Sequence, residues 1–209
     1  GKKRAEQIVK KLGKNAIGII NDKGVEALRG IKGISGKTAI TIVDSIRENF
    51  EVHEVIEKLR KYHIPLSIIL KLYKEYRIET VQKVLQDPYI MTRFRGMGFF
   101  KVDEIARRYI GIPVYSSYRV SACIRYTLNT ICSNHGHSYI SEEELIEQTE
   151  INLNKYVDEV ERVNKEDIQL GIYANDDKFL IAQKGKVYPK RYFEYENNIA
   201  SNLSIIRNN

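Results

Sequence analysis

A short stretch near the N-terminus combines residue types that could bind an anion at the start of a helix. Gly33 permits the backbone angles of a tight turn, Ile34 is suited to burial inside that turn, and Ser35 is a favoured N-cap residue. The amides that follow would point out of a helix N-terminus, which carries a partial positive charge, and Lys37 adds a full charge. We call this predicted phosphate-binding turn the first elbow; it comprises Gly33, Ile34, Ser35, Gly36, Lys37 and Thr38.

The same residues imitate a nucleotide-binding loop. Gly36-Lys37-Thr38 matches the end of the P-loop pattern G-x-x-x-x-G-K-[ST], whose amides and lysine hold ATP phosphates. The first glycine of that pattern would fall on Ile31, and Gly30 lies one residue too early. No apolar strand precedes the turn, although a P-loop follows a strand. The sequence therefore favours a turn between two helices over a P-loop.

A second stretch repeats the plan of the first elbow. Gly96 and Gly98 flank an apolar Met97, and a helix with an apolar face follows. Phe99 is expected in the core, whereas Phe100 is the better candidate for stacking on unpaired bases. For both elbows the alternative is a plain corner between helices, which needs the same glycine. The residues predicted to bind phosphate at this second elbow are Gly96, Met97, Gly98, Phe100 and Lys101.

Two further stretches look like incomplete copies. The chain begins at Gly1 as if at the last residue of such a turn, and Lys2, Lys3 and Arg4 would flank a phosphate there. Residues 62–66, Tyr-His-Ile-Pro-Leu, resemble a worn copy without glycines and are predicted to be scaffold. The spacing between copies is irregular, so the chain is not a solenoid.

Charge is distributed unevenly along this chain of net charge +7. Residues 1–112 hold 23 Lys/Arg and 13 Asp/Glu, a net of +10, whereas residues 113–209 hold 11 and 14, a net of −3. The basic half is therefore the candidate surface for a polyanion. A solvated basic surface without a ligand remains the alternative.

Composition indicates a globular protein of the cytoplasm. Apolar residues make up 43% of the chain, which is enough for a core, and the apolar runs are too short to predict a membrane span. No signal peptide is visible, and Gly1 suggests a fragment. Cys123 and Cys132 lie nine residues apart in one expected helix, which fits a reducing compartment better than a local disulfide.

The apolar spacing predicts a mainly helical chain with a few strands. Helices are expected at residues 2–12, 15–20, 25–28, 38–50, 52–62, from Pro65 to Tyr76, at 79–85, after Gly98, at 117–134, from Ser141, and at 154–163 and 191–206. Strands are expected at 138–140 and in a hairpin that pairs 168–173 with 179–182; residues 187–189 could add a strand. Beyond the break at 111–113 this order is typical of a winged-helix-like module, although a short helical domain with one hairpin would give the same pattern.

The elbows and their order along the chain resemble a known family. Two turns of the form Gly-apolar-Gly/Ser before a basic helix resemble helix-hairpin-helix motifs, which bind DNA backbone phosphate without reading bases. The sets Asp87-Pro-Tyr89, Arg95-Gly-Met-Gly-Phe99, Asp103-Glu-Ile-Ala106, Gly136-His-Ser-Tyr139 and Val187-Tyr-Pro189 resemble the N-terminal region of RecD/TraA-type ATP-dependent DNA helicases. The resemblance covers nearly all 209 residues. It implies a mainly α fold with a tandem helix-hairpin-helix DNA-binding domain at 1–112 and a winged-helix-like α+β module at 113–209.

The resemblance also implies a helicase motor that moves 5′ to 3′ and uses ATP with magnesium, in DNA recombination or repair. No complete Walker A motif occurs in the sequence, so the chain itself is expected to carry no cofactor and no enzymatic activity. The implied partners are DNA, single-stranded or as a duplex or junction, and the motor domains of the same parent chain, with no membrane. Ser35 departs from the second glycine usual at an elbow, and Val102 replaces a usual alanine.

Three hypotheses follow from the residues and the resemblance. The first is non-sequence-specific binding of DNA phosphates as the accessory region of a RecD-like helicase. The second is a scaffold that docks on the motor or on a partner, with little DNA affinity of its own. The third, an enzyme in its own right, has little support, because no catalytic arrangement stands out. The set Cys132, His135 and His137 makes a poor tetrahedral metal site, since three ligands fall within six residues and no fourth is evident, so no metal is predicted.

Overall fold

The computed structural model describes residues 2–208, with side chains except at residues 135 and 200–208. It divides into two compact units, Gly1–Lys83 and Val84–Asn209. The expected mainly helical architecture with a small sheet is confirmed. The predicted boundary between residues 112 and 113 falls inside the second unit. Among the described residues, no helix combines the length and apolar character that crossing a membrane requires.

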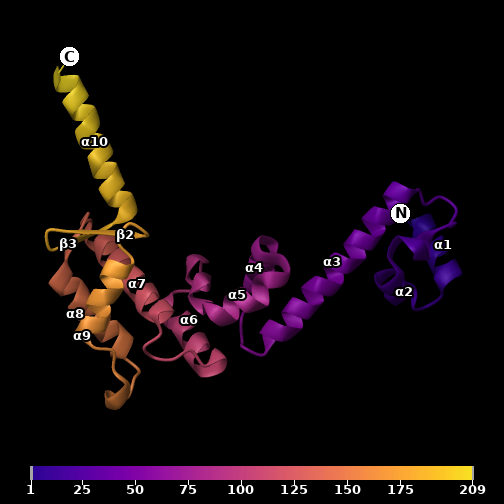
Figure 1. Ribbon diagram of the computed structural model, residues 1–209, viewed down its shortest axis with the longest axis horizontal. Coiled ribbons are helices and arrows are strands. Elements are labelled where there is room, and N and C mark those ends of the chain that lie inside the picture. Colours follow the sequence, from indigo (N-terminus) through magenta and orange to yellow (C-terminus); the bar gives the residue numbers. More distant parts are fainter. Residues whose placement is uncertain (1, 209) are drawn as a thin grey trace. The chain divides into compact units, whose positions relative to one another are not determined.

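The N-terminal unit is entirely helical. It contains α1 (Lys2–Leu12), α2 (Ala16–Lys23), the 3₁₀-helix η1 (Gly24–Leu28), α3 (Gly36–Arg60), α4 (Leu66–Tyr76) and η2 (Arg77–Glu79). Helices α1 and α2 gather near the start of α3 (Figure 1), and α4 contacts α3. Helix α5 (Thr80–Gln86) contains the division between the units.

Helix α3 corrects one prediction. The sequence predicted two helices, at 38–50 and 52–62, but a single 25-residue helix runs through both. Ala39 and Val43 are buried at one end and Val55 and Leu59 at the other, so the two apolar faces belong to one helix that serves two clusters. Glu51, between them, has a side chain compatible with a continuous helix and accepts a hydrogen bond from the Tyr73 hydroxyl at 3.1 Å.

One apolar cluster holds the first elbow in place. Its buried members come from α2, η1, the turn and the first two turns of α3, and half-buried isoleucines and a leucine from α1, α2, the turn and α3 surround them. Burial of this kind supplies most of the stability of short helices, which are marginal alone. The buried members are Ile20, Ala27, Leu28, Ile31, Ala39 and Val43.

The C-terminal unit contains the second elbow and, after it, the helices and strands of the sheet module. Its elements are η3 (Pro88–Arg93), α6 (Phe99–Ile105), the π-helical turn η4 (Ala106–Ile110), α7 (Ser117–His135), β1 (Ile140–Ser141), α8 (Glu142–Asn154), η5 (Glu159–Glu161), α9 (Lys165–Ala174), β2 (Leu180–Gln183), β3 (Lys186–Pro189) and α10 (Lys190–Asn208). The three strands form an antiparallel sheet in the order β1-β3-β2, with Ile140 opposite Val187 and Leu180 opposite Pro189.

Helix α7 is the centre of this module and contacts α8, α9 and the sheet. Helix α9 comes so close that a Cβ on Gly171 would lie 2.9 Å from side-chain atoms of Ile124 and Val120, which would then have to shift. The order helix, strand, helix, helix, hairpin matches the predicted order, but the third helix and the hairpin are formed by other residues than predicted.

Two predicted elements in this module are wrong. Residues 168–173 form the middle of α9 instead of a strand, because Ile168 and Ile172 are buried one helical turn apart. The hairpin pairs β2 with β3 instead, around Lys184 and Gly185, which both have positive φ as a two-residue hairpin turn requires. The predicted helix at 154–163 is a loop with the short η5, held at its ends by Asn154, whose side chain bonds the Val163 backbone.

Candidate nucleic-acid interface

Three turns in the chain share one backbone plan. A residue with positive φ opens each turn: Gly33 at +85°, His63 at +58° and Gly96 at +83°. A buried or half-buried apolar residue follows, and the next residue is the N-cap of a helix. The worn copy at residues 62–66 therefore retains the turn, although it has no glycine. Its apolar residue is Ile64 and its N-cap is Pro65.

The first elbow places a capped helix start at the surface. The Ser35 hydroxyl accepts a hydrogen bond from the Thr38 amide at 3.3 Å and lies 3.0 Å from the Thr38 hydroxyl. The amides of Gly36 and Lys37 precede the first intrahelical bond, from Ala39 to the Ser35 carbonyl, and remain oriented out of the helix. Of the amides at Gly36, Lys37 and Thr38, the first two can therefore bind an anion, because the Thr38 amide already donates to the Ser35 hydroxyl.

Helix α1 places its start beside the first elbow. A cleft of about 500 Å³ has α1 on one side, through Arg4 and Ile8, and the start of α3 on the other, through Ser35, Lys37 and Thr38. Lys2, Lys3 and Arg4 are exposed in the first turn of α1, so the structure brings this predicted group next to the first elbow. Residues 1–38 contain ten Lys/Arg and three Asp/Glu, which makes the cleft's surroundings strongly basic.

The second elbow has a different chemistry. Its N-cap, Gly98, has no side chain to accept a hydrogen bond, so the amides of the first turn of α6 are uncapped. Met97 is buried, and its amide donates to the Phe94 carbonyl at 3.0 Å. Phe99 is buried as expected. Lys101 is exposed in the same turn.

Phe100 is half-buried in a group of aromatic rings. Its ring meets those of Phe99, Tyr126 and Tyr156 edge-on, at centroid distances of 5.4, 5.4 and 6.5 Å. The Lys155 ammonium lies 5.3 Å from the Phe100 ring centroid. The predicted stacking residue is therefore one member of a cationic aromatic cluster.

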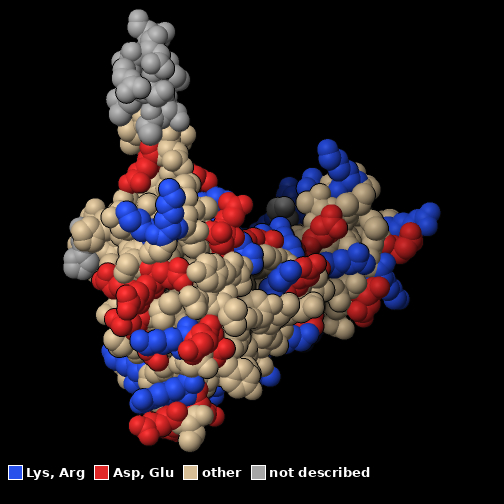
Figure 2. Space-filling model, turned by 60° about the vertical axis from the view of Figure 1, so that its left-hand side comes forward, with Lys and Arg blue, Asp and Glu red and all other residues tan. Residues whose placement is uncertain are grey.

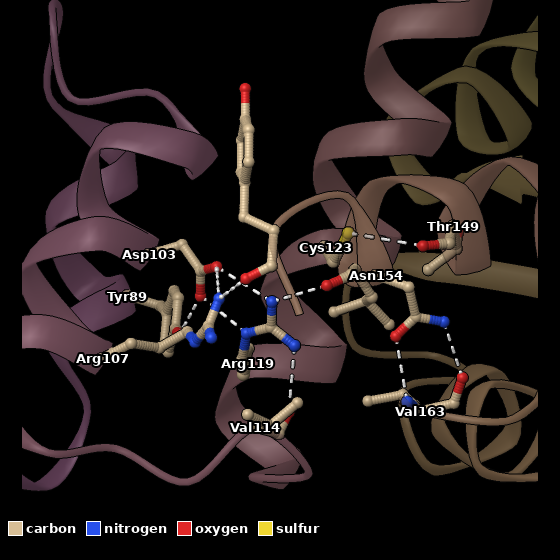
Figure 3. A network of polar contacts seen from close by, with 11 residues as sticks. Tyr89, Asp103, Arg107, Val114, Arg119, Cys123, Thr149, Asn154 and Val163 are labelled. Atoms are coloured by element: carbon tan, nitrogen blue, oxygen red, sulfur yellow. Dashed lines mark hydrogen bonds and ion pairs between the residues drawn. The ribbon is translucent and has the colours of Figure 1, made fainter. Parts of the chain in front are cut away.

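A buried ion pair locks α6 to the module that follows (Figure 3). Asp103 of α6 accepts two hydrogen bonds from Arg119 of α7, at 2.7 Å from Nε and 2.9 Å from Nη2. The Arg119 side chain is 1% exposed and also donates to the carbonyls of Val114 at 3.0 Å and Leu153 at 2.8 Å. The Tyr89 hydroxyl donates to the same carboxylate at 2.6 Å. One network thus joins η3, α6, α7 and the end of α8.

The network is buried enough to shift a pKa. Burial, followed by the charge of Asp103 and its hydrogen bond, raises the pKa of Tyr89 far above its usual range. The hydroxyl therefore keeps its proton and stays a donor to Asp103.

This network was missed from the sequence, although a signal was present. Asp103 occupies a core position of α6, between the buried Val102 and Ile105, and Arg119 precedes the buried Val120. A charged residue on an apolar helix face requires a buried partner. The sequence offers several candidate partners for it, and only the fold selects Arg119.

The predicted site residues separate into two groups. Lys2, Lys3, Arg4 and the first elbow lie together in the N-terminal unit, whereas the second elbow lies in the C-terminal unit. Of the rejected metal set, Cys132 is buried, His137 is exposed, and the His135 side chain lies outside the described part of the chain.

Comparison with known families identifies the central region. Residues 48–139 match the family model described as the ATP-dependent RecD2 DNA helicase HHH domain. This match confirms the predicted resemblance to a RecD-type helicase for these residues. The match begins inside α3, includes the worn turn and the second elbow, and ends just before β1; the first elbow precedes it.

Proposed function

We propose that this chain binds DNA through backbone phosphates, without base readout, as the accessory region of a RecD-like 5′–3′ helicase of recombination or repair in the cytoplasm. The observation that carries the proposal is the first elbow: two outward amides of α3, Lys37 and the basic start of α1 surround one cleft. Backbone amides and lysines recognise phosphate and carry no sequence information.

The second elbow is the other proposed contact, through the uncapped first turn of α6 and Lys101. Its place in the matched HHH domain supports this role. The motor domains of the same parent chain, with their ATP and magnesium, are the proposed protein partner.

A charge-reversal experiment tests the proposal. The variant Lys37→Glu with Lys101→Glu should weaken binding to duplex and single-stranded DNA alike, and the slope of log affinity against log salt should fall by about 2, because two phosphate contacts are lost. Fluorescence anisotropy with labelled DNA at several salt concentrations measures both quantities.

The matched control changes the net charge equally away from the elbows. Lys74→Glu with Lys83→Glu alters two exposed lysines of α4 and α5. If the control weakens binding as much as the elbow variant does, the general field binds DNA and the elbow assignment is wrong.

A second candidate function, docking on the motor or on a partner protein, is favoured by one observation on the winged-helix-like module. Its third helix, α9, carries Glu166 and Asp167 in its first turn, and α8 begins with Glu142, Glu143 and Glu144. Figure 2 shows acidic and basic side chains alternating over the C-terminal unit. The acidic first turns of α8 and α9 repel phosphate, and a surface of mixed charge suits a protein contact. Absent DNA binding at low salt, with tight binding to the separately purified motor, would favour this candidate.

A further inference from the structure

A groove lies beside the second elbow in the C-terminal unit. It has a volume of about 1180 Å³ and is bounded by α6 and η4, by the connection at residues 111–115, and by the loop at 156–163. The first turn of α6 supplies Phe100 and Lys101 to its wall. The groove therefore begins at the turn where the second elbow is proposed to hold a phosphate.

Exposed aromatic rings line this groove. The side chains of Tyr115 and Tyr156 are 76% and 69% exposed, from the two loops on either side of α6 and η4. The Tyr156 ring also contacts Phe100, and the Lys155 ammonium lies 5.4 Å from its centroid. Exposed aromatic rings beside cations are the features on which unpaired bases stack.

The charges of the groove favour an anion at its α6 side. Lys101, Arg107 and Arg108 line that wall, and Arg162 lines the loop. On the same wall Asp103 is bound by Arg119 and lies 4.0 Å from Arg107, and Glu104 lies 3.6 Å from Arg108. Both arginines are therefore engaged with acids, and Lys101 is the wall's candidate ligand for a phosphate. Two further acids, Glu161 and Asp167, belong to the opposite wall. A bound strand would thus place a phosphate at Lys101 and its bases toward the tyrosines.

The loop that carries Tyr156 is held in place at three points. The Asn154 side chain bonds the Val163 amide at 3.0 Å and its carbonyl at 2.9 Å, which closes the base of the loop (Figure 3). Arg107 donates to the Tyr156 carbonyl at 3.1 Å. A wall held in this way loses little conformational entropy when it binds a ligand.

We propose that this groove, here called the strand groove, binds single-stranded DNA, with bases stacked on Tyr115 and Tyr156 and a phosphate at Lys101. The proposal rests on the proposed function and adds that the DNA bound at the second elbow is single-stranded. Duplex DNA is excluded from the groove because its bases are stacked on each other and have no free faces to offer the tyrosines.

The test compares two strand forms on the full chain. Tyr115→Ala with Tyr156→Ala should weaken binding to an oligothymidine of about 16 nucleotides by at least tenfold, since stacking is worth about 1–3 kcal/mol per base. Binding to a duplex of the same length should stay within twofold. Tyr115→Phe with Tyr156→Phe keeps both rings and should retain the wild-type affinity for the single strand.

The matched control is Tyr195→Ala, which removes a similarly exposed ring of α10 outside the groove and should change neither affinity. An unchanged single-strand affinity in the double-alanine variant, as expected if the groove receives a protein segment, would overturn the inference while the proposed function stands. Equal loss for both strand forms would also overturn it. A wild-type chain that binds neither DNA would refute the proposed function and the inference together.

Discussion

Removing the charge of Asp103 should destabilise the C-terminal unit far more than any surface change. In Asp103→Asn, the Arg119 guanidinium keeps its carbonyl partners at Val114 and Leu153 but loses its only bidentate anion among the described residues. The Arg119 side chain is 1% exposed, so water cannot replace the hydrogen bonds that it loses. Leaving one partner of a buried pair uncompensated costs about 3–5 kcal/mol.

The replacement Arg119→Met should be costly for the opposite reason. Asp103 would retain the Tyr89 hydroxyl, and the two carbonyls would lose their donor. In the double variant Asp103→Asn with Arg119→Met neither charge remains, so the loss should be smaller than the sum of the single losses by about 1–3 kcal/mol. The size of this coupling measures how strongly the pair joins α6 to α7.

Urea unfolding followed by circular dichroism measures these differences. Glu104→Gln is the control on the same helix, because its exposed pair with Arg108 should contribute about 0–1 kcal/mol. A loss below about 1 kcal/mol in Asp103→Asn would refute the reasoning, since it would mean that the network is solvated.

Three further predictions concern stability. Gly33→Ala should cost about 1–2 kcal/mol by thermal unfolding because of its φ of +85°, whereas Gly36→Ala, which has open space for a Cβ, should be neutral or stabilising; equal effects would contradict the turn geometry. Thr149→Val should stabilise by about 1 kcal/mol in urea, because the buried hydroxyl has no hydrogen-bond partner among the described residues, and a loss would reveal one. Burial raises the pKa of Cys123 from 9.0 to about 12, so its stabilisation is complete below pH 9 and is lost as the pH rises toward 12. When the pH rises from about 8 to about 11, the free energy of unfolding of Cys123→Ala should therefore fall by about 3 kcal/mol less than that of the wild type. Equal falls in the two proteins would argue against a buried thiol.

Local chemistry made the elbows predictable. Gly33 and Gly96 have the positive φ that the turns require, and Ser35 caps α3 as expected. Information of this kind lies within a few neighbouring residues, so a sequence reveals it. The resemblance to RecD/TraA-type helicases then linked these local patterns along the chain.

Long-range choices were not predictable in the same way. The apolar pattern at 168–173 suits a strand or a helix, and only contact with α7 through Gly171 selects the helix. The sequence predicted separate helices at 38–50 and 52–62, yet α3 runs through Glu51, which accepts a hydrogen bond from Tyr73 of another helix. The partner of Asp103 lies 16 residues away, where helical spacing gives no guidance.

The turn at His63 has a consequence for how such proteins diverge. A histidine there adopts the left-handed angles of its glycine counterparts, and the following Ile64 is buried, as Met97 is after Gly96. The shape of such a turn depends on main-chain angles, so a residue other than glycine can form it where it tolerates positive φ. Turns of this kind would be found more completely by comparing backbone φ and ψ angles than by searching for glycine motifs in the sequence.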